Sequence, residues 1–110
     1  MNPKGQFEKA IALMKKHSPQ LQEEGFHTLR PHAAEHLDDL MTAFQSEQDH
    51  GLRCWILELI GIAKAPAALP LLAEELRSSD ESLRHWAIWG LRQLDTRDAR
   101  RLLFEAGIKR

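Results

Sequence analysis

The sequence of 110 residues contains a single cysteine, Cys54, no tyrosine and no long hydrophobic run. One cysteine excludes an internal disulfide and a metal cage built from thiolates. No apolar segment approaches the roughly 20 residues that a membrane-spanning helix needs. The first residues also lack the continuous hydrophobic stretch of a secretory signal. These absences favour a cytoplasmic protein that does not associate with membranes.

Glycine-rich loops and strand patterns are also missing. The six glycines are isolated, so no loop is available to cradle a phosphate group. No segment alternates polar and apolar residues with the period of two that marks a half-buried strand. The composition, 43% apolar and 28% charged, is that of an ordinary globular domain. Helices are therefore the expected secondary structure throughout.

The chain does contain a repeated sequence motif. Residues 49–55, Asp-His-Gly-Leu-Arg-Cys-Trp, return 31 positions later at 80–86 as Asp-Glu-Ser-Leu-Arg-His-Trp. Ser18 precedes Asp49 by the same interval, and serine and aspartate are both favoured helix N-caps. A fixed period of this length is typical of stacked helical repeats, in which each unit buries its apolar face against its neighbours.

This period predicts one domain over residues 1–110, all-α, with about seven helices stacked as an α–α superhelix. A first helix is expected at 6–16, followed by helix pairs in repeats at about 18–48, 49–79 and 80–107. The second helix of the first repeat is expected at 32–46. The two helices of the second repeat are expected at 51–64 and 67–78, and those of the third at 81–94 and 97–106, with Gly107 as a C-terminal cap.

The repeated phrase also carries a resemblance. Residues 52–61, followed by Ala68-Leu69-Pro70-Leu71-Leu72, resemble the short bacterial HEAT repeats that are also found in relatives of phycobilin lyases. The resemblance covers 49–106 in two copies and 18–48 loosely, and it implies a fold more than an activity. It further implies that the second helices of the repeats line a concave face. No chromophore site or other cofactor follows from it.

Charge is unevenly distributed although the formal net charge is only −1. Between residues 21 and 50, seven acidic residues face Arg30 alone, whereas the segment from Arg92 onward is basic. An acidic middle argues against nucleic acid, which requires a coherent basic face. It suits a basic protein partner.

One stretch matches the sequence motif of a metal site. His32-Ala33-Ala34-Glu35-His36 matches the His-x-x-Glu-His order of a class of zinc peptidases. A helix would place His32 and His36 on one face, with Glu35 as a base. With Leu37 pointing inward, however, these side chains are expected to point outward, and the family's distant acidic ligand is missing. The preferred interpretation is a solvated helix face without metal, and the alternative is a zinc-dependent hydrolase.

Other recurrent side chains have structural interpretations. Trp55 and Trp86 are expected to seal adjacent repeats, whereas Trp89 is expected to point outward, as a binding anchor or as a cover for one end of the stack. Arg53 and Arg84 are expected to reach acidic caps of neighbouring repeats. Cys54 is expected to have no chemical role, because neither a base nor an oxyanion donor is apparent.

The candidate partner-binding residues are those expected to face outward on or near the second helices, together with Trp89: Glu35, His36, Asp39, Leu71, Glu74, Glu75, Trp89 and Leu102. They form an apolar strip with an acidic rim, which suits protein binding. The leading hypothesis is a non-enzymatic binding module, monomeric when free, such as an immunity protein that neutralises a basic toxin. A regulatory or assembly subunit that self-associates through Phe7 or residues 102–104 is the other alternative.

Overall fold

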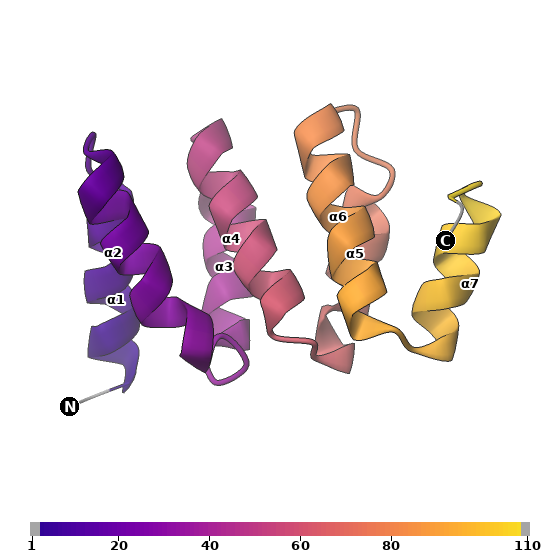
Figure 1. Ribbon diagram of the computed structural model, residues 1–110, viewed down its shortest axis with the longest axis horizontal. Coiled ribbons are helices and arrows are strands. Elements are labelled where there is room, and N and C mark those ends of the chain that lie inside the picture. The colour runs from indigo at the N-terminus through magenta and orange to yellow at the C-terminus, as the bar shows by residue number, and fades with distance from the viewer. Residues whose placement is uncertain (1–2, 109–110) are drawn as a thin grey trace.

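The computed structural model describes residues 3–108, and these residues fold entirely as helices and short connections (Figure 1). No strand occurs in this range, so the all-α prediction is confirmed, as is the number of helices. The helices are α1 (Pro3–Met14), α2 (Pro19–Leu29), α3 (Leu37–Ser46), α4 (His50–Ile62), α5 (Leu69–Glu75), α6 (Glu81–Leu94) and α7 (Arg97–Glu105), with 3₁₀ turns at Arg30–His32 and Pro66–Ala68.

The helices form two layers along the 41 Å long axis of the molecule. In Figure 1, α2, α4 and α6 lie in the front layer, with α1, α3 and α5 behind them and α7 at the far end. The closest packing joins α4 to α6 and α1 to α2, and α3 and α5 pack mainly on α4 and α6 rather than on each other.

Two glycines allow α4 and α6 to approach each other. A Cβ on Gly61 would lie 3.0 Å from the Cα of Gly90 and 2.9 Å from Cζ3 of Trp89. A Cβ on Gly90 would lie 2.9 Å from Cδ2 of Leu72. Because glycine has no side chain, the backbones can come this close without displacing their neighbours.

Side-chain caps fix where the later helices begin. Asp49 and Asp80 each accept a hydrogen bond from the backbone N–H three residues on, at Leu52 and Leu83, both 2.9 Å long. These bonds satisfy amides that have no partner within the helix. Ser18 occupies the N-cap position of α2, but its side chain makes no capping bond. Ser18 is therefore the N-cap by position, as expected, with Pro19 as the first helical residue.

The core is continuous along the stack. Its largest fully buried side chains come from five of the helices: Leu29, Leu40, Phe44, Ile56, Leu57, Leu59, Ile60, Leu72 and Leu91. Fully burying one such side chain is worth about 1.5–3 kcal/mol. The two repeat-matched leucines Leu52 and Leu83 are also buried, at equivalent places near the starts of α4 and α6.

Helix boundaries follow the prediction where caps are strong and depart from it near prolines. The segment 81–94 is helical as predicted. In contrast, α3 starts at Leu37 rather than at residue 32, and α5 spans only Leu69–Glu75. A 3₁₀ turn containing Pro31 and another starting at Pro66 precede these helices, because proline restricts the preceding residue and lacks an N–H. The first helix begins at Pro3, earlier than the predicted residue 6.

Candidate protein-binding surface

Four of the predicted partner-binding residues are acidic, and the structure leaves all of them accessible to solvent. Glu35 and Glu74 are exposed, whereas Asp39 and Glu75 are half-buried. Glu74 and Glu75 line a depression of about 670 Å³ at the end of α5, together with Arg77. Burial raises the pKa of the Glu75 carboxyl, and neighbouring acidic groups raise it further against the opposing effect of Arg53.

The apolar strip predicted beside these acids is not present. Leu71 was expected to face outward, but only 6% of it is exposed, and it belongs to the core. Leu102, its repeat-matched counterpart on α7, is half-buried. The prediction for Leu71 is wrong because α5 starts late, after the 3₁₀ turn, which changes the direction of its side chains relative to one long helix.

His36 was also expected to face outward, and this prediction is wrong. Only 2% of the residue is exposed, and its ring lies 5.6 Å from the ring of Phe7 on α1. The Nε2 atom is buried without a hydrogen-bond partner. His36 is the N-cap residue of α3, in the turn that replaces the predicted start of the helix. It therefore packs toward α1 rather than toward solvent.

The His-x-x-Glu-His stretch consequently does not form the face that a zinc site would require. His32 Nδ1 lies 3.3 Å from Glu35 Oε1, while His36 points into the core. Within residues 3–108, no group of three or more histidine, cysteine, aspartate or glutamate side chains is placed to hold a metal ion.

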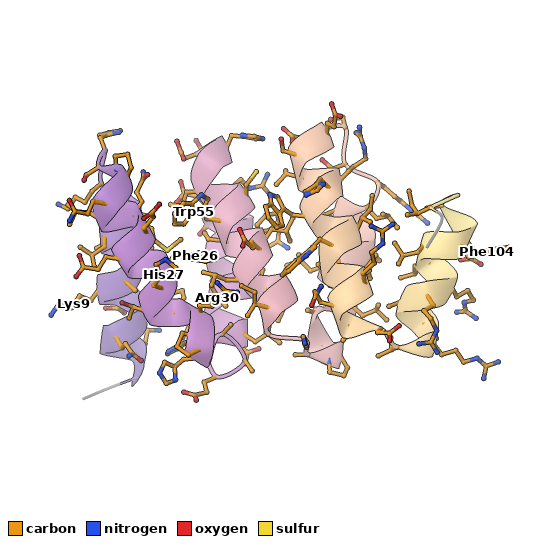
Figure 2. All side chains as sticks on the ribbon, in the orientation of Figure 1. Lys9, Phe26, His27, Arg30, Trp55 and Phe104 are labelled. Atoms are coloured by element: carbon orange, nitrogen blue, oxygen red, sulfur yellow. The ribbon has the colours of Figure 1, made fainter. Side chains whose placement is uncertain are left out.

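The tryptophans all contribute to packing between helices. Trp55 is half-buried and meets Phe26 of α2 edge-on, with ring centroids 4.9 Å apart, in the interface between α2 and α4 (Figure 2). Trp86 packs against the core and against Trp89, 5.6 Å away. Trp89 was expected to point outward, as an anchor or as a cover for one end of the stack, but it is half-buried and its ring lies against Gly61 on α4. Gly61, whose repeat-matched counterpart is Arg92, has no side chain and so leaves the space that the Trp89 ring fills.

The arginines Arg53 and Arg84 do not reach acidic caps as predicted. Arg53 Nε donates to the carbonyl oxygen of Phe44 at 3.4 Å, and its guanidinium lies 4.1 Å from the centroid of that ring. Arg84 Nη1 donates to the carbonyl oxygen of Ser78 at 2.8 Å. Both arginines therefore bind backbone carbonyl groups of the preceding helix or its C-terminal connection.

A histidine of α4, His50, pairs with Asp80, the N-cap residue of α6. His50 Nε2 on α4 lies 2.9 Å from Asp80 Oδ2 at the start of α6. The Leu83 amide and His50 together hold the pKa of the Asp80 carboxyl below its usual value. Cys54 Sγ lies 3.8 Å from the same nitrogen of His50.

The cluster of Cys54, His50 and Asp80 does not have the geometry of a catalytic relay. A relay uses the two ring nitrogens of histidine separately, one toward the nucleophile and one toward the acid. Here both partners meet Nε2. Burial and Asp80 raise the pKa of the Cys54 thiol, although Arg53 opposes them, so the thiol is kept in its less nucleophilic form.

A second hollow lies elsewhere, between the end of α6 and α7. We call it the C-terminal pocket. It has a volume of about 1120 Å³, and its lining combines apolar side chains with charged ones: Leu91, Arg92, Asp95, Arg97, Arg100, Arg101, Leu103, Phe104, Gly107 and Ile108. Four arginines thus face a single aspartate.

The turn between α6 and α7 sets the geometry of this pocket. Asp95 ends α6 in the left-handed conformation, with φ of 50°, which aspartate tolerates better than most residues do. Arg100 Nη1 donates to the carbonyl oxygen of Asp95 at 2.8 Å and to its carboxylate at 3.0 Å. Thr96 then caps α7 by accepting from the Ala99 amide at 3.1 Å. These bonds hold α7 against α6.

The opposite end of α7 brings Ile108 into the pocket. Gly107 has φ of 79°, and the Ile108 N–H donates to the Leu103 carbonyl oxygen at 2.9 Å. The Gly107 N–H donates to the Phe104 carbonyl oxygen at 3.0 Å. This pair of bonds is a Schellman motif, so the prediction of Gly107 as a C-terminal cap is confirmed. The reversal of the backbone turns Ile108 toward the core.

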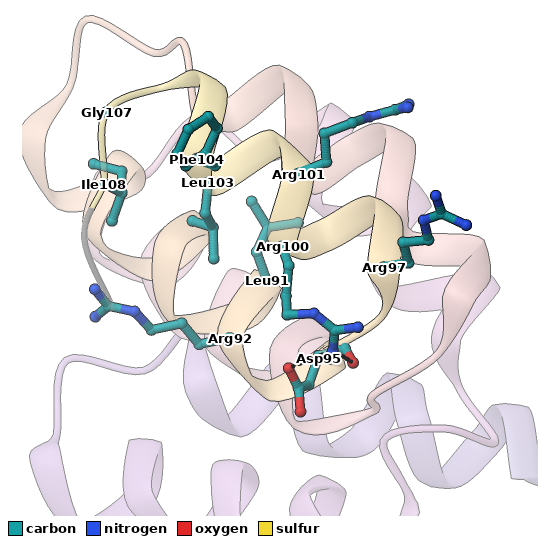
Figure 3. A pocket seen from close by; sticks show the side chains of 10 residues that line it. All are labelled: Leu91, Arg92, Asp95, Arg97, Arg100, Arg101, Leu103, Phe104, Gly107 and Ile108. Atoms are coloured by element: carbon teal, nitrogen blue, oxygen red, sulfur yellow. Dashed lines mark hydrogen bonds and ion pairs between the residues drawn. The ribbon is translucent and has the colours of Figure 1, made fainter.

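Figure 3 shows how the lining residues are arranged. Leu91, Leu103 and Ile108 gather beneath α7, Arg92 extends to one side of them, and Arg100 with Asp95 lies on the other. Phe104 stands on the outer side of α7. It is 82% exposed, whereas Phe7, proposed for the same role at the other end of the stack, is only 8% exposed.

The prediction of the partner-binding residues missed this pocket, although the repeat register contains its signal. Phe104 takes the position held by Ala73 and Thr42 in the preceding repeats, and Ile108 takes that of Arg77. Large apolar residues at positions that are small or polar in the other repeats indicate that this surface differs from the corresponding surfaces of those repeats.

Comparisons with protein-family models, with curated proteins and with solved structures find no match. None of the helices within residues 3–108 combines the length and hydrophobicity that crossing a membrane requires.

Proposed function

We propose that the protein is a non-enzymatic protein-binding module, a short HEAT-like superhelix that binds its partner through the C-terminal pocket. The observation that carries this proposal is the 82% exposure of Phe104 beside an apolar hollow. Exposed aromatic side chains next to apolar pockets are typical anchors of protein interfaces. The paired helices in two layers support the superhelical part of the proposal.

The composition of the pocket also favours a protein over a small metabolite. Its floor is aliphatic, and its charges are arginines, a residue type enriched at protein interfaces. The volume of about 1120 Å³ exceeds the range of about 300–1,000 Å³ that is usual for small-molecule sites. A partner that presents several apolar side chains would fill it better than a single compact ligand.

A second candidate uses the acidic surface of α5. In this version the protein is an immunity protein or inhibitor that neutralises a basic partner such as a toxin, through Glu74 and Glu75. The pKa of the Glu75 carboxyl, raised mainly by burial and further by Glu74 and Asp80 against the effect of Arg53, favours it. A cationic partner would relieve the repulsion among these carboxylates and would be attracted over long range.

Photo-crosslinking in the native host tests both candidates together. A photoreactive phenylalanine analogue replaces Phe104 in one variant and Glu74 in another, and Gln45, an exposed residue of α3, serves as the control position. We expect a discrete protein adduct from position 104 and none from position 45. An adduct from position 74 alone would move the binding site to the acidic surface. The absence of a protein adduct from both positions would contradict the proposed function.

A further inference from the structure

The outer side of α7 differs from the corresponding parts of the preceding repeats. Leu71 and Leu72 on α5 are both buried, whereas Leu102 on α7 is half-buried. Among the described residues, α7 packs mainly against α6, while α4 has neighbours in α2, α3 and α6. Leu103 is buried, but the half-buried Leu102 and the 82% exposed Phe104 leave apolar surface of α7 open to solvent at this end.

The spacing of the apolar residues suits a helical occupant. Leu91 comes from α6, Leu103 and Phe104 come from α7, and Ile108 comes from the turn that follows. Leu91 and Leu103 are buried beneath the pocket, so Phe104 of α7 and Ile108 of the following turn present its accessible apolar surface. Amphipathic helices pack their apolar faces into grooves of this kind. A helix inserts side chains at positions i, i+3, i+4 and i+7 into such a groove, which continues the helix-on-helix packing of the stack.

The charges at the margin select the kind of helix. Arg97, Arg100 and Arg101 are exposed around the apolar floor. Arg100 is engaged with Asp95 at 3.0 Å, and Arg101 makes a long pair of 4.0 Å with Asp98. Guanidinium groups bind carboxylates through two parallel hydrogen bonds when the geometry permits. A helix that carries glutamate or aspartate beside its apolar stripe is therefore complementary to this margin.

A second copy docked through the same surface is disfavoured by the same charges. A two-fold contact of α7 on α7 would bring the exposed Arg97 and Arg101 of one protomer against those of its partner. Like charges placed face to face oppose association, and they do so most strongly at low salt.

We propose that the C-terminal pocket binds an acidic amphipathic helix of another protein. The apolar stripe of that helix packs on the exposed Phe104 and the half-buried Ile108, and its carboxylates pair with the arginine margin. This inference rests on the proposed function and adds the chemistry of the partner. It differs from the sequence-based expectation of a basic partner, because the acidic residues that motivated that expectation lie outside this pocket.

The test uses two designed helical peptides with the same leucine positions at i, i+3, i+4 and i+7. One peptide has glutamates flanking the stripe and the other has lysines, and binding is measured by fluorescence anisotropy at two salt concentrations. We expect the glutamate peptide to bind at least tenfold more tightly, with affinity falling as salt rises. Phe104→Ala should weaken it by tenfold or more, as for an aromatic anchor. The double variant Arg97→Glu, Arg101→Glu should reverse the preference between the peptides.

Lys9→Glu provides the matched control, because Lys9 is an exposed cation at the opposite end of the stack (Figure 2). It should leave both affinities unchanged. Equal binding of the two peptides, no saturable binding of the glutamate peptide, or tighter binding of a single-stranded oligonucleotide would each overturn the inference. Self-association that Phe104→Ala abolishes would assign the surface to a second copy instead.

The outcome of this test is separable from that of the crosslinking experiment. A protein adduct from position 104 whose linked segment is not acidic would leave the proposed function in place and overturn the acidic-helix inference. If no adduct forms from position 104, the inference loses its site even where the glutamate peptide binds.

Discussion

At the scale of single residues, Glu58 shows how equivalent positions acquire different roles. It lies on α4 at the position that Trp89 occupies on α6. Its side chain is half-buried, and burial raises the pKa of its carboxyl, with Arg30 opposing the rise. A carboxyl whose pKa is higher in the folded than in the unfolded chain favours folding only while it is protonated. That contribution is complete below the unfolded pKa and is lost as pH rises through the folded pKa.

Glu58→Gln should therefore become more stable relative to the original protein as pH rises from acid to neutral. The amide removes a carboxylate that must be desolvated in the folded state and keeps nearly the same shape. Thermal unfolding followed by circular dichroism at several pH values measures the difference. Glu8→Gln on the exposed side of α1 is the control and should show no such trend. If the difference in stability between Glu58→Gln and the original protein stayed constant from pH 4 to pH 7, burial would not be the cause of the raised pKa.

The predictions for individual side chains succeeded or failed according to the local backbone. Trp55 was correctly expected to seal two repeats, since it lies within a regular helix. His36 and Leu71 were placed on the wrong side, because the directions were derived from helices that were expected to start earlier. Helical periodicity of 100° per residue does not extend through a 3₁₀ turn. The contact between His36 and Phe7 also joins distant segments, which no local pattern can show.

At the scale of elements, the packing of α1 on α2 depends on a close approach at Gly25. A Cβ there would meet the carbonyl oxygen of Ala10 in the α1 backbone and would lie 2.8 Å from Cγ of Met14. A side-chain end could move, but the backbone of a packed helix cannot do so without shifting the whole element. Gly51, near the start of α4, has its nearest neighbour at 3.6 Å, which is an ordinary contact.

Gly25→Ala should therefore destabilise the protein by about 1–3 kcal/mol or more, the cost of overpacking a close contact. Gly51→Ala should instead stabilise it by up to about 1 kcal/mol, because alanine loses less backbone entropy in a helix. Urea unfolding of the two variants beside the original protein gives both values. A neutral Gly25→Ala would mean that α1 and α2 can move apart without loss, contrary to the packing described above.

Prediction of the elements worked best where a capping side chain and a helical pattern agreed. The start of α6 could be located from Asp80, and its end lies at the predicted residue 94. The C-terminal reversal at Gly107 could be predicted because glycine adopts positive φ without strain. The sequence pattern around prolines 31, 66 and 70 predicted that helices begin nearby. It did not predict whether a 3₁₀ turn would precede each helix. That choice depends on packing against other elements.

At the scale of the whole molecule, the described helices extend over 41 × 26 × 22 Å, and each packs mainly against one to three others. Elements with fewer neighbours open at lower free energy than those at the centre of the core. A central element such as α4 is held by three other helices, whereas α7 packs mainly on α6. The repeat spacing made the all-α fold and its seven helices predictable. The open apolar surface beside α7 was not predictable in detail, because it is formed jointly by α6, α7 and Ile108.

Amide hydrogen exchange should therefore show α7 opening at lower free energy than α4. Leu103→Ala, which removes a buried contact of α7, should speed exchange in α7 much more than in α4. Leu57→Ala, in the centre of α4, should lower global stability by about 2–5 kcal/mol and bring the protection of the two helices closer together. Equal protection of α4 and α7 in the original protein would indicate that the two helices open together, in one all-or-none unit.

If α7 opens separately, a helix bound in the C-terminal pocket should increase the protection of the α7 amides, since binding stabilises only the closed form.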